Sequence, residues 1–179
     1  KALCLLGDTS AVEYLAAWLA DQPLPGEQRY DWEGFLDVPE VDAVMWLLGA
    51  AGDARAVPVL VAKLERCGAE AGHFGHVRAV TTALGRIGRA EAAPALHRFL
   101  RKDGAAGHMD VEGDARSLRA DRFAKAYVEL HAAAALVRCG DHQGLGRRIL
   151  TAYLDDWRGV LARFAGHVQL ILLQGIALG

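Results

Sequence analysis

The chain has 179 residues, 53% of them hydrophobic, which is enough to bury one core of ordinary domain size. Its 20 Lys and Arg residues nearly balance its 22 Asp and Glu residues, and the net charge of −2 excludes an overall field that would attract nucleic acid or an anionic membrane. Aromatic residues make up only 7% whereas alanine and leucine are abundant, and this balance predicts closely packed helices and an all-α fold.

An internal repeat starts near the N-terminus and returns twice, at offsets of 45 and then 36 residues. In each copy an apolar helix ends at a glycine, a short turn follows, and a second apolar helix begins. Pro58 and Pro94 occupy the same place in their copies, where a first-turn proline is tolerated. The matching positions are Gly7, Asp8, Ala11, Val12, Leu15 and Leu19; Gly52, Asp53, Ala56, Val57, Leu60 and Leu64; and Gly88, Ala92, Ala93, Pro94, Leu96 and Leu100.

A fourth, weaker copy ends its first helix at Gly140, with Asp141 restoring the Gly-Asp pair, but its second helix diverges. The final residues, Leu178 and Gly179, resemble the middle of a further first helix. The pattern therefore predicts one domain over 1–179, an α-α superhelix of about four helix pairs plus a truncated fifth. Because Lys1 begins inside a helix, we expect a fragment of a longer multidomain protein, with self-association through uncapped ends.

The third copy carries a resemblance to a known family. Two stretches of it resemble bacterial HEAT repeats of the phycobilisome-lyase type: Val77-Arg78-Ala79-Val80 with Ala83-Leu84-Gly85-Arg86-Ile87-Gly88, and Ala92-Ala93-Pro94-Ala95-Leu96. The resemblance implies antiparallel helix pairs that stack into a HEAT-like solenoid, since one pair alone cannot bury its apolar face. The shared residues are packing positions, so the lyase activity is not carried over.

Three insertions interrupt the register, and binding residues tend to lie in such insertions: Asp21 to Pro39, Gly68 to His76, and Asp103 to Arg116. The first is rich in aromatic residues. We predict Tyr30, Trp32 and Phe35 as partner-binding residues that anchor a protein or a neighbouring domain. The alternative is that these side chains fill a small core beneath their own loop.

Cys67, His73 and His76 have the residue types and part of the spacing of a zinc site, because thiolate and imidazole groups are good zinc ligands. A fourth ligand is missing, so these three are retained only as candidates and no metal is predicted. The cysteines, Cys4, Cys67 and Cys139, are odd in number and lie in apolar helical patterns, which favours reduced core thiols.

Other chemistries find little support in the residues. The arginines that a nucleic-acid surface would need are interspersed with Asp and Glu, which favours a salt-bridged surface. The apolar stretch 168–178 contains Gln169, Gln174 and Gly175 and is too short to cross a bilayer. No catalytic or cofactor-binding residue is therefore predicted in this chain. Localisation is left open, with the cytoplasm as the starting expectation.

A looser resemblance links His131 to Leu136, Arg138-Cys139-Gly140-Asp141-His142 and Asp156-Trp157-Arg158-Gly159 to the helical C-terminal region of bacterial FAD-dependent oxidoreductases. It implies an FAD domain upstream of Lys1 and no flavin-binding residue within the chain. The first functional hypothesis is thus a protein-interaction scaffold or accessory helical module. The second is the accessory domain of such an oxidoreductase, and the third is a nucleic-acid-binding or metal-binding module.

Overall fold

A computed structural model describes residues 9–24, 38–107 and 120–155, and within these ranges it contains seven α-helices and no strand. The predicted all-α fold is confirmed. The α-helices are α2 (Val12–Asp21), α3 (Glu40–Ala51), α4 (Val57–Arg66), α5 (Phe74–Ile87), α6 (Ala93–Leu100), α7 (Ala120–Arg138) and α8 (Leu145–Asp155). Short 3₁₀ turns are η1 (Ala54–Ala56), η2 (Ala71–His73), η3 (Ala90–Ala92) and η5 (His142–Gly144).

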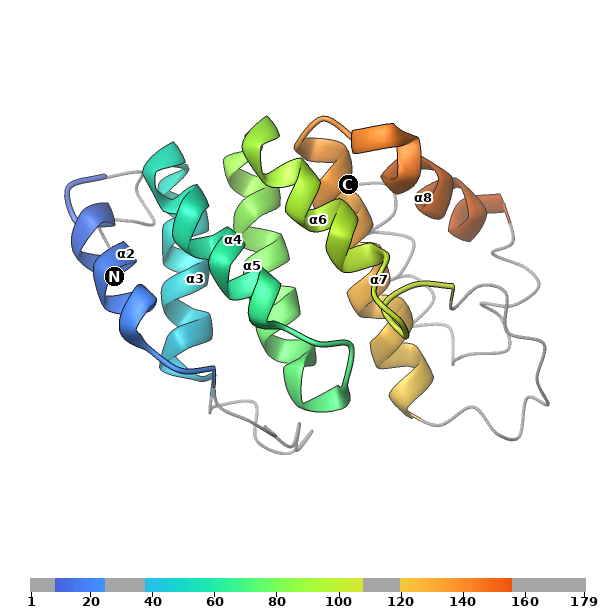
Figure 1. The fold of residues 1–179 in the computed structure, drawn as a ribbon, viewed down its shortest axis with the longest axis horizontal. Helices are drawn as coiled ribbons and strands as arrows, with labels where there is room; N and C mark the ends of the chain where they lie inside the picture. Colours follow the sequence, from blue (N-terminus) through green and yellow to red (C-terminus); the bar gives the residue numbers. More distant parts are fainter. Residues whose placement is uncertain (1–8, 25–37, 108–119, 156–179) are drawn as a thin grey trace.

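The helices form two layers that follow one another along the molecule (Figure 1). The shorter helices α2, α4, α6 and α8 make the front layer, and the longer helices α3, α5 and α7 make the back layer. Successive helices alternate between the layers, so each short turn joins a back-layer helix to a front-layer helix. This arrangement is the α-α superhelix predicted from the repeat.

One hydrophobic core runs between the layers. Leu48, Leu60, Leu84 and Leu96, one from each of four successive helices, are completely buried. Each such side chain contributes about 1.5–3 kcal/mol relative to leaving it exposed. Since each layer supplies one side of the core, neither layer could bury its apolar face alone.

Glycines end the back-layer helices as the repeat predicts. Gly52 and Gly88 follow α3 and α5 in the left-handed conformation, with φ of 69° and 66°. In that conformation the chain leaves the helix and turns toward the front layer. Pro58 and Pro94 then lie in the first turn of α4 and α6, which confirms the role predicted for them.

Two further glycines let the back-layer helices approach one another closely. A Cβ atom on Gly49 of α3 would lie 2.5 Å from the Cα of Ala83 in α5, and one on Gly85 of α5 would lie 3.1 Å from the Cα of Ala135 in α7. Gly49 and Gly85 are 36 residues apart, so they are the same position in two copies of the repeat. The repeat therefore encodes close helix packing as well as helix ends.

The front-layer helices are joined by lysine side chains instead. Lys63 of α4 is only 2% exposed, and its Nζ donates hydrogen bonds to the carbonyl oxygens of Ala20 (3.4 Å) and Gln22 at the end of α2. Burial lowers the pKa of this ammonium group. The bonds satisfy carbonyl groups that have no partner within α2, and they place a cation at the negative end of that helix.

The next pair of front-layer helices repeats this arrangement. Lys102, which follows α6, donates from Nζ to the carbonyl oxygens of Glu65 (3.1 Å) and Cys67 (2.6 Å) at the end of α4. These two acceptors lie 45 residues after Ala20 and Gln22, so they are the equivalent positions of the following repeat. Each of these helix ends is thus capped by a lysine that lies in the next front-layer helix or just after it.

The turn after α7 differs from the two before it, although Gly140 and Asp141 restore the Gly-Asp pair of the repeat and divergence was predicted only for the helix that follows. Asp141 is left-handed, with φ of 51°, whereas its counterpart Asp53 is extended. The Asp141 carboxylate accepts hydrogen bonds from the backbone N–H groups of Gly146 (2.7 Å) and Arg147 (3.3 Å), at the start of α8. The Asp141 side chain is 5% exposed, and of its two bonds the one to Gly146 is partly buried whereas the one to Arg147 lies at the surface.

We expect Asp141→Ala to lower the free energy of unfolding by about 2 kcal/mol, because it removes a helix cap and places alanine in a left-handed conformation. Asp141→Asn should lose less than about 1 kcal/mol, since asparagine tolerates this conformation and keeps an oxygen acceptor. Urea unfolding followed by circular dichroism measures both. Equal losses for the two variants would contradict the capping role.

Candidate partner-binding surface

The residues predicted to contact a partner, Tyr30, Trp32 and Phe35, lie outside the described residues. Of the interruption between Asp21 and Pro39, the structure describes only its two ends. The aromatic-anchor hypothesis therefore stays a prediction. The described helices and turns offer a second candidate surface.

The second predicted interruption is shorter than expected. α5 begins at Phe74, so His76 lies within a helix and is completely buried, where a loop residue was predicted. Its Nδ1 lies 2.5 Å from Oδ1 of Asp42, a residue of α3 that is 2% exposed. This buried polar pair links two back-layer helices, and sequence spacing gave no sign of it because the partners are 34 residues apart.

The structure gives the three metal-ligand candidates separate partners. Cys67 donates a hydrogen bond to the carbonyl oxygen of Lys63 (3.4 Å), and Nδ1 of His73 accepts one from the backbone N–H of Gly68 (2.8 Å). The ring of His76 lies 6.3 Å from that of His73 and faces its own carboxylate partner. Across the described parts of the chain, no group of three or more His, Cys, Asp or Glu residues could hold a metal ion.

Cys67 and Cys139 are buried free thiols, which confirms the interpretation of these two as reduced core cysteines. Burial raises the pKa of Cys67 to about 12 and that of Cys139 to about 11. Both groups are therefore protonated at neutral pH, whereas the thiolate is the form that attacks electrophiles and binds metals. Cys4 lies outside the described residues.

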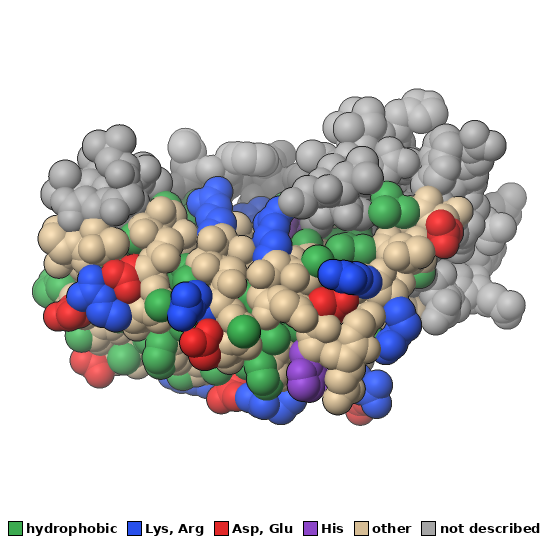
Figure 2. All heavy atoms as spheres, turned by 90° about the horizontal axis from the view of Figure 1, so that it is seen from above, with side chains coloured by type: hydrophobic (Ala, Val, Ile, Leu, Met, Phe, Trp, Pro, Cys, Tyr) green, Lys and Arg blue, Asp and Glu red, His purple; other side chains and the backbone are tan. Residues whose placement is uncertain are grey.

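Charged side chains are scattered among hydrophobic ones over the exposed edge that carries the turns η1, η3 and η5 (Figure 2). Figure 2 looks onto this edge and shows acidic and basic side chains next to one another rather than separated by sign. The front layer continues this pattern: Arg98 of α6 pairs with Glu65 of α4 at 2.5 Å, with both side chains more than half exposed. A surface with alternating charges favours a partner whose own charges are complementary at specific positions, and it does not attract every molecule of one net charge.

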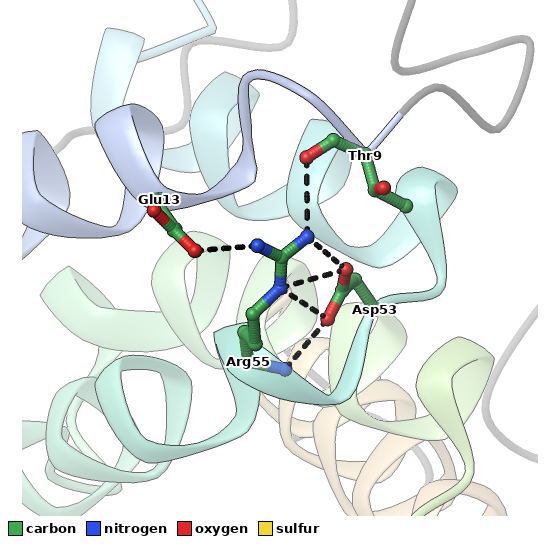
Figure 3. Close-up of polar contacts among 4 residues, drawn as sticks. All are labelled: Thr9, Glu13, Asp53 and Arg55. Carbon is green, nitrogen blue, oxygen red and sulfur yellow. Dashed lines mark hydrogen bonds and ion pairs between the residues drawn. The ribbon is translucent and has the colours of Figure 1, made fainter.

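Arg55 joins several residues of this edge through hydrogen bonds and ion pairs (Figure 3). Its guanidinium donates to both carboxylate oxygens of Asp53, at 2.7–3.1 Å, and reaches across to Glu13 of α2 (2.5 Å) and the carbonyl oxygen of Thr9 (3.4 Å). The hydrogen bonds from Arg55 lower the pKa of Asp53, and those to Asp53 and Glu13 raise the pKa of Arg55. The turn between α3 and α4 is thereby tied to the start of α2.

A second cluster lies where α6 meets the turn before α8. The rings of His97 in α6 and His142 in η5 are 5.1 Å apart and nearly perpendicular, at 82°. Partial burial lowers the pKa of His97, and His142, Arg101 and Arg148 lower it further through their positive charge. We call these four residues, His97, Arg101, His142 and Arg148, the His–Arg cluster. Sequence reasoning missed it because its two halves are more than 40 residues apart.

Comparison with known proteins gives one family match. Residues 77–102 match the PBS lyase HEAT-like repeat. The matched segment contains most of α5 and all of η3 and α6. The match confirms the HEAT-type resemblance of the third copy. No curated protein and no solved structure matches the chain.

None of the helices in the described ranges combines the length and apolar character that crossing a bilayer requires.

Proposed function

We propose that this HEAT-repeat protein is a scaffold that binds a protein partner on the exposed side of its front layer. The observation that carries the proposal is the row of front-layer helices, in which α2 packs against α4, α4 against α6, and α6 against the turn η5 that leads into α8 (Figure 1). Stacked helical repeats offer an extended surface on which a partner contacts several repeats at once. The match to a HEAT-like repeat supports this reading at the level of the fold.

The contacts between front-layer helices support the proposal because they hold the surface in one arrangement before a partner arrives. Lys63 and Lys102 fix helix ends, and the pair between Arg98 and Glu65 bridges α4 and α6. A surface that is already ordered loses less conformational entropy on binding, so more of the contact energy appears as affinity. The alternation of charges then gives the partner a pattern to match.

The other functional hypotheses stay predictions. An accessory role beside an FAD-dependent oxidoreductase domain rests only on the resemblance of 131–136, 138–142 and 156–159. Self-association through uncapped ends and a nucleic-acid-binding role have no described contact that favours them. The interspersed charges of the exposed edge support a protein partner over a polyanion (Figure 2).

Site-specific photo-crosslinking tests the proposed surface. Ala17 of α2 and Ala62 of α4 are exposed, and they are the same position in two successive repeats. A photoreactive amino acid at either position should give an adduct with the same partner, and excess unmodified chain should suppress it. The same amino acid at Glu40 or Arg86, exposed residues of the back layer, serves as the matched control. Adducts only from the back-layer positions, or none at all, would overturn the proposal.

A further inference from the structure

We propose that the His–Arg cluster binds a phosphate monoester carried by the protein partner. The inference names the chemistry of the partner and in that respect rests on the proposed function. The cluster itself is defined by contacts within this chain, so a small phosphate compound can test it without the partner.

The fold brings the two histidine rings into contact, and the positive charges of Arg101 and Arg148 act on His97 from either side of that contact. His97 and Arg101 lie one helical turn apart at the end of α6, His142 belongs to η5, and Arg148 lies in the first turn of α8. The Nη1 of Arg148 donates to the carbonyl oxygen of Gln143 (3.2 Å), which holds this guanidinium beside the turn. The two histidine rings are in contact, with their centroids 5.1 Å apart.

The charges that act on His97 in this cluster are all positive. They come from His142 on the turn, Arg101 directly after α6 and Arg148 on α8. Arg98, the neighbour of His97 in the sequence, is engaged with Glu65 on the α4 side. Within the described chain, Arg101 takes part in none of the ion pairs formed by carboxylates. The cluster therefore has cationic donors to offer an anion.

The backbone that carries His142 is unusual. Gly140, Asp141, Gln143 and Gly144 all have positive φ, at 102°, 51°, 59° and 67°. Positive φ at a residue other than glycine costs on the order of 1 kcal/mol, and such strain collects where a side chain has to be held in a particular place. Capping of α8 accounts for Asp141, whereas Gln143 has no such role. The strained turn does place His142 against His97.

The charges select the class of ligand. A metal cation would be repelled by Arg101 and Arg148, whereas a compact dianion can accept hydrogen bonds from guanidinium and imidazole groups together. An extended polyanion fits less well, because exposed carboxylates adjoin the cluster in sequence: Glu91 precedes α6 and Asp103 follows Arg101. A single phosphate monoester is a compact dianion, and its charge matches the basic groups of the cluster.

Histidine NMR on the whole chain measures binding directly. Phenyl phosphate at pH 7 should produce saturable shifts of the ring C–H signals of His97 and His142, assigned with His97→Gln and His142→Gln. The ester should also raise the pKa of both rings, since an anion stabilises imidazolium. Arg101→Gln with Arg148→Gln should weaken binding at least about tenfold. The control, Arg66→Gln with Arg86→Gln, removes the same charge from exposed residues outside the cluster and should leave binding unchanged.

Several outcomes would overturn the inference. Shifts no larger than those from sodium chloride at equal ionic strength would mean that the cluster is not an anion site. Inorganic phosphate binding as tightly as phenyl phosphate would assign the site to the free ion, and tighter binding of a single-stranded DNA oligomer would assign it to nucleic acid. Phosphate binding without front-layer crosslinking would refute only the proposed function, and crosslinking without phosphate binding would refute only this inference.

Discussion

Replacing Gly49 by alanine is expected to lower the free energy of unfolding by about 2 kcal/mol, although alanine is the better helix former by about 1 kcal/mol. The new Cβ would lie 2.5 Å from the Cα of Ala83 and 2.8 Å from its Cβ. The nearer atom belongs to the backbone of α5, so no side-chain rotation can relieve the overlap. The back-layer helices have to move apart, which loosens packing across the interface between successive repeats.

Gly85→Ala is the matched control for this prediction. Gly85 is the same position in the next repeat, but its Cβ would lie 3.1 Å from the Cα of Ala135, where a shift of a few tenths of an ångström is enough. We expect the free energy of unfolding to change by less than about 1 kcal/mol, because helix propensity offsets the milder contact. Urea unfolding by circular dichroism compares the two. If the Gly49→Ala variant is as stable as the parent, α5 can move away from α3 without lowering the free energy of unfolding, and the prediction is wrong.

Acidification between pH 6.5 and pH 4 is expected to destabilise the protein through His131. Burial lowers the pKa of this residue from 6.5 to about 4, with smaller contributions from the charges of Arg78 and Arg138. Its ring lies 4.4 Å from that of Tyr127, and its Nε2 is buried without a hydrogen-bond partner among the described residues. The folded state therefore keeps this ring neutral.

The direction follows from proton binding in the two states. Above pH 6.5 the ring is neutral in both the folded and the unfolded chain, and its titration does not affect stability. As the pH falls below 6.5, His131 of the unfolded chain binds a proton. The same ring in the folded chain stays neutral until about pH 4, so acidification favours the unfolded state. At pH 5 the loss amounts to about 2 kcal/mol.

His131→Phe tests this assignment because it keeps an aromatic ring beside Tyr127 and removes the titration. The variant should gain about 2 kcal/mol in free energy of unfolding, relative to the parent, between pH 7.5 and pH 5. Because each protein is compared with itself at the two pH values, any constant packing effect of phenylalanine cancels. Parallel pH curves for the parent and the variant would contradict a neutral, buried His131. His131→Leu repeats the test with a smaller side chain.

The sequence predicts the course of the chain better than it predicts contacts between repeats. Gly52, Gly88 and Pro94 mark helix ends because glycine and proline act through their own backbone, which a one-dimensional pattern records. The sequence could also have marked Gly49, because Gly49 and Gly85 occupy the same position in two copies of the repeat. Its meaning depends on how closely α3 and α5 approach, and that distance is a property of the stacked helices.

The candidate surface was harder to foresee for the same reason. The aromatic anchors are predicted in an insertion, whereas the His–Arg cluster is assembled from the end of α6, the turn η5 and the start of α8. In the sequence, His142 is marked only by the Gly-Asp pair before it and by the oxidoreductase-like segment 138–142 that contains it. Nothing in the spacing shows that a left-handed turn brings it against His97. His76 was expected in a loop, but α5 starts early enough to bury it beside Asp42.

The lysine caps of the front layer run in one direction along the chain, and this has a consequence for folding during translation. The carbonyl of Gln22 is capped by Lys63, 41 residues later, and that of Cys67 by Lys102, 35 residues later. A ribosome releases the chain from its N-terminus, so α2 emerges before the residue that completes its end, and α4 does so in turn. Each repeat therefore reaches its final bonding only when the following one has left the exit tunnel, and folding lags synthesis by about one repeat.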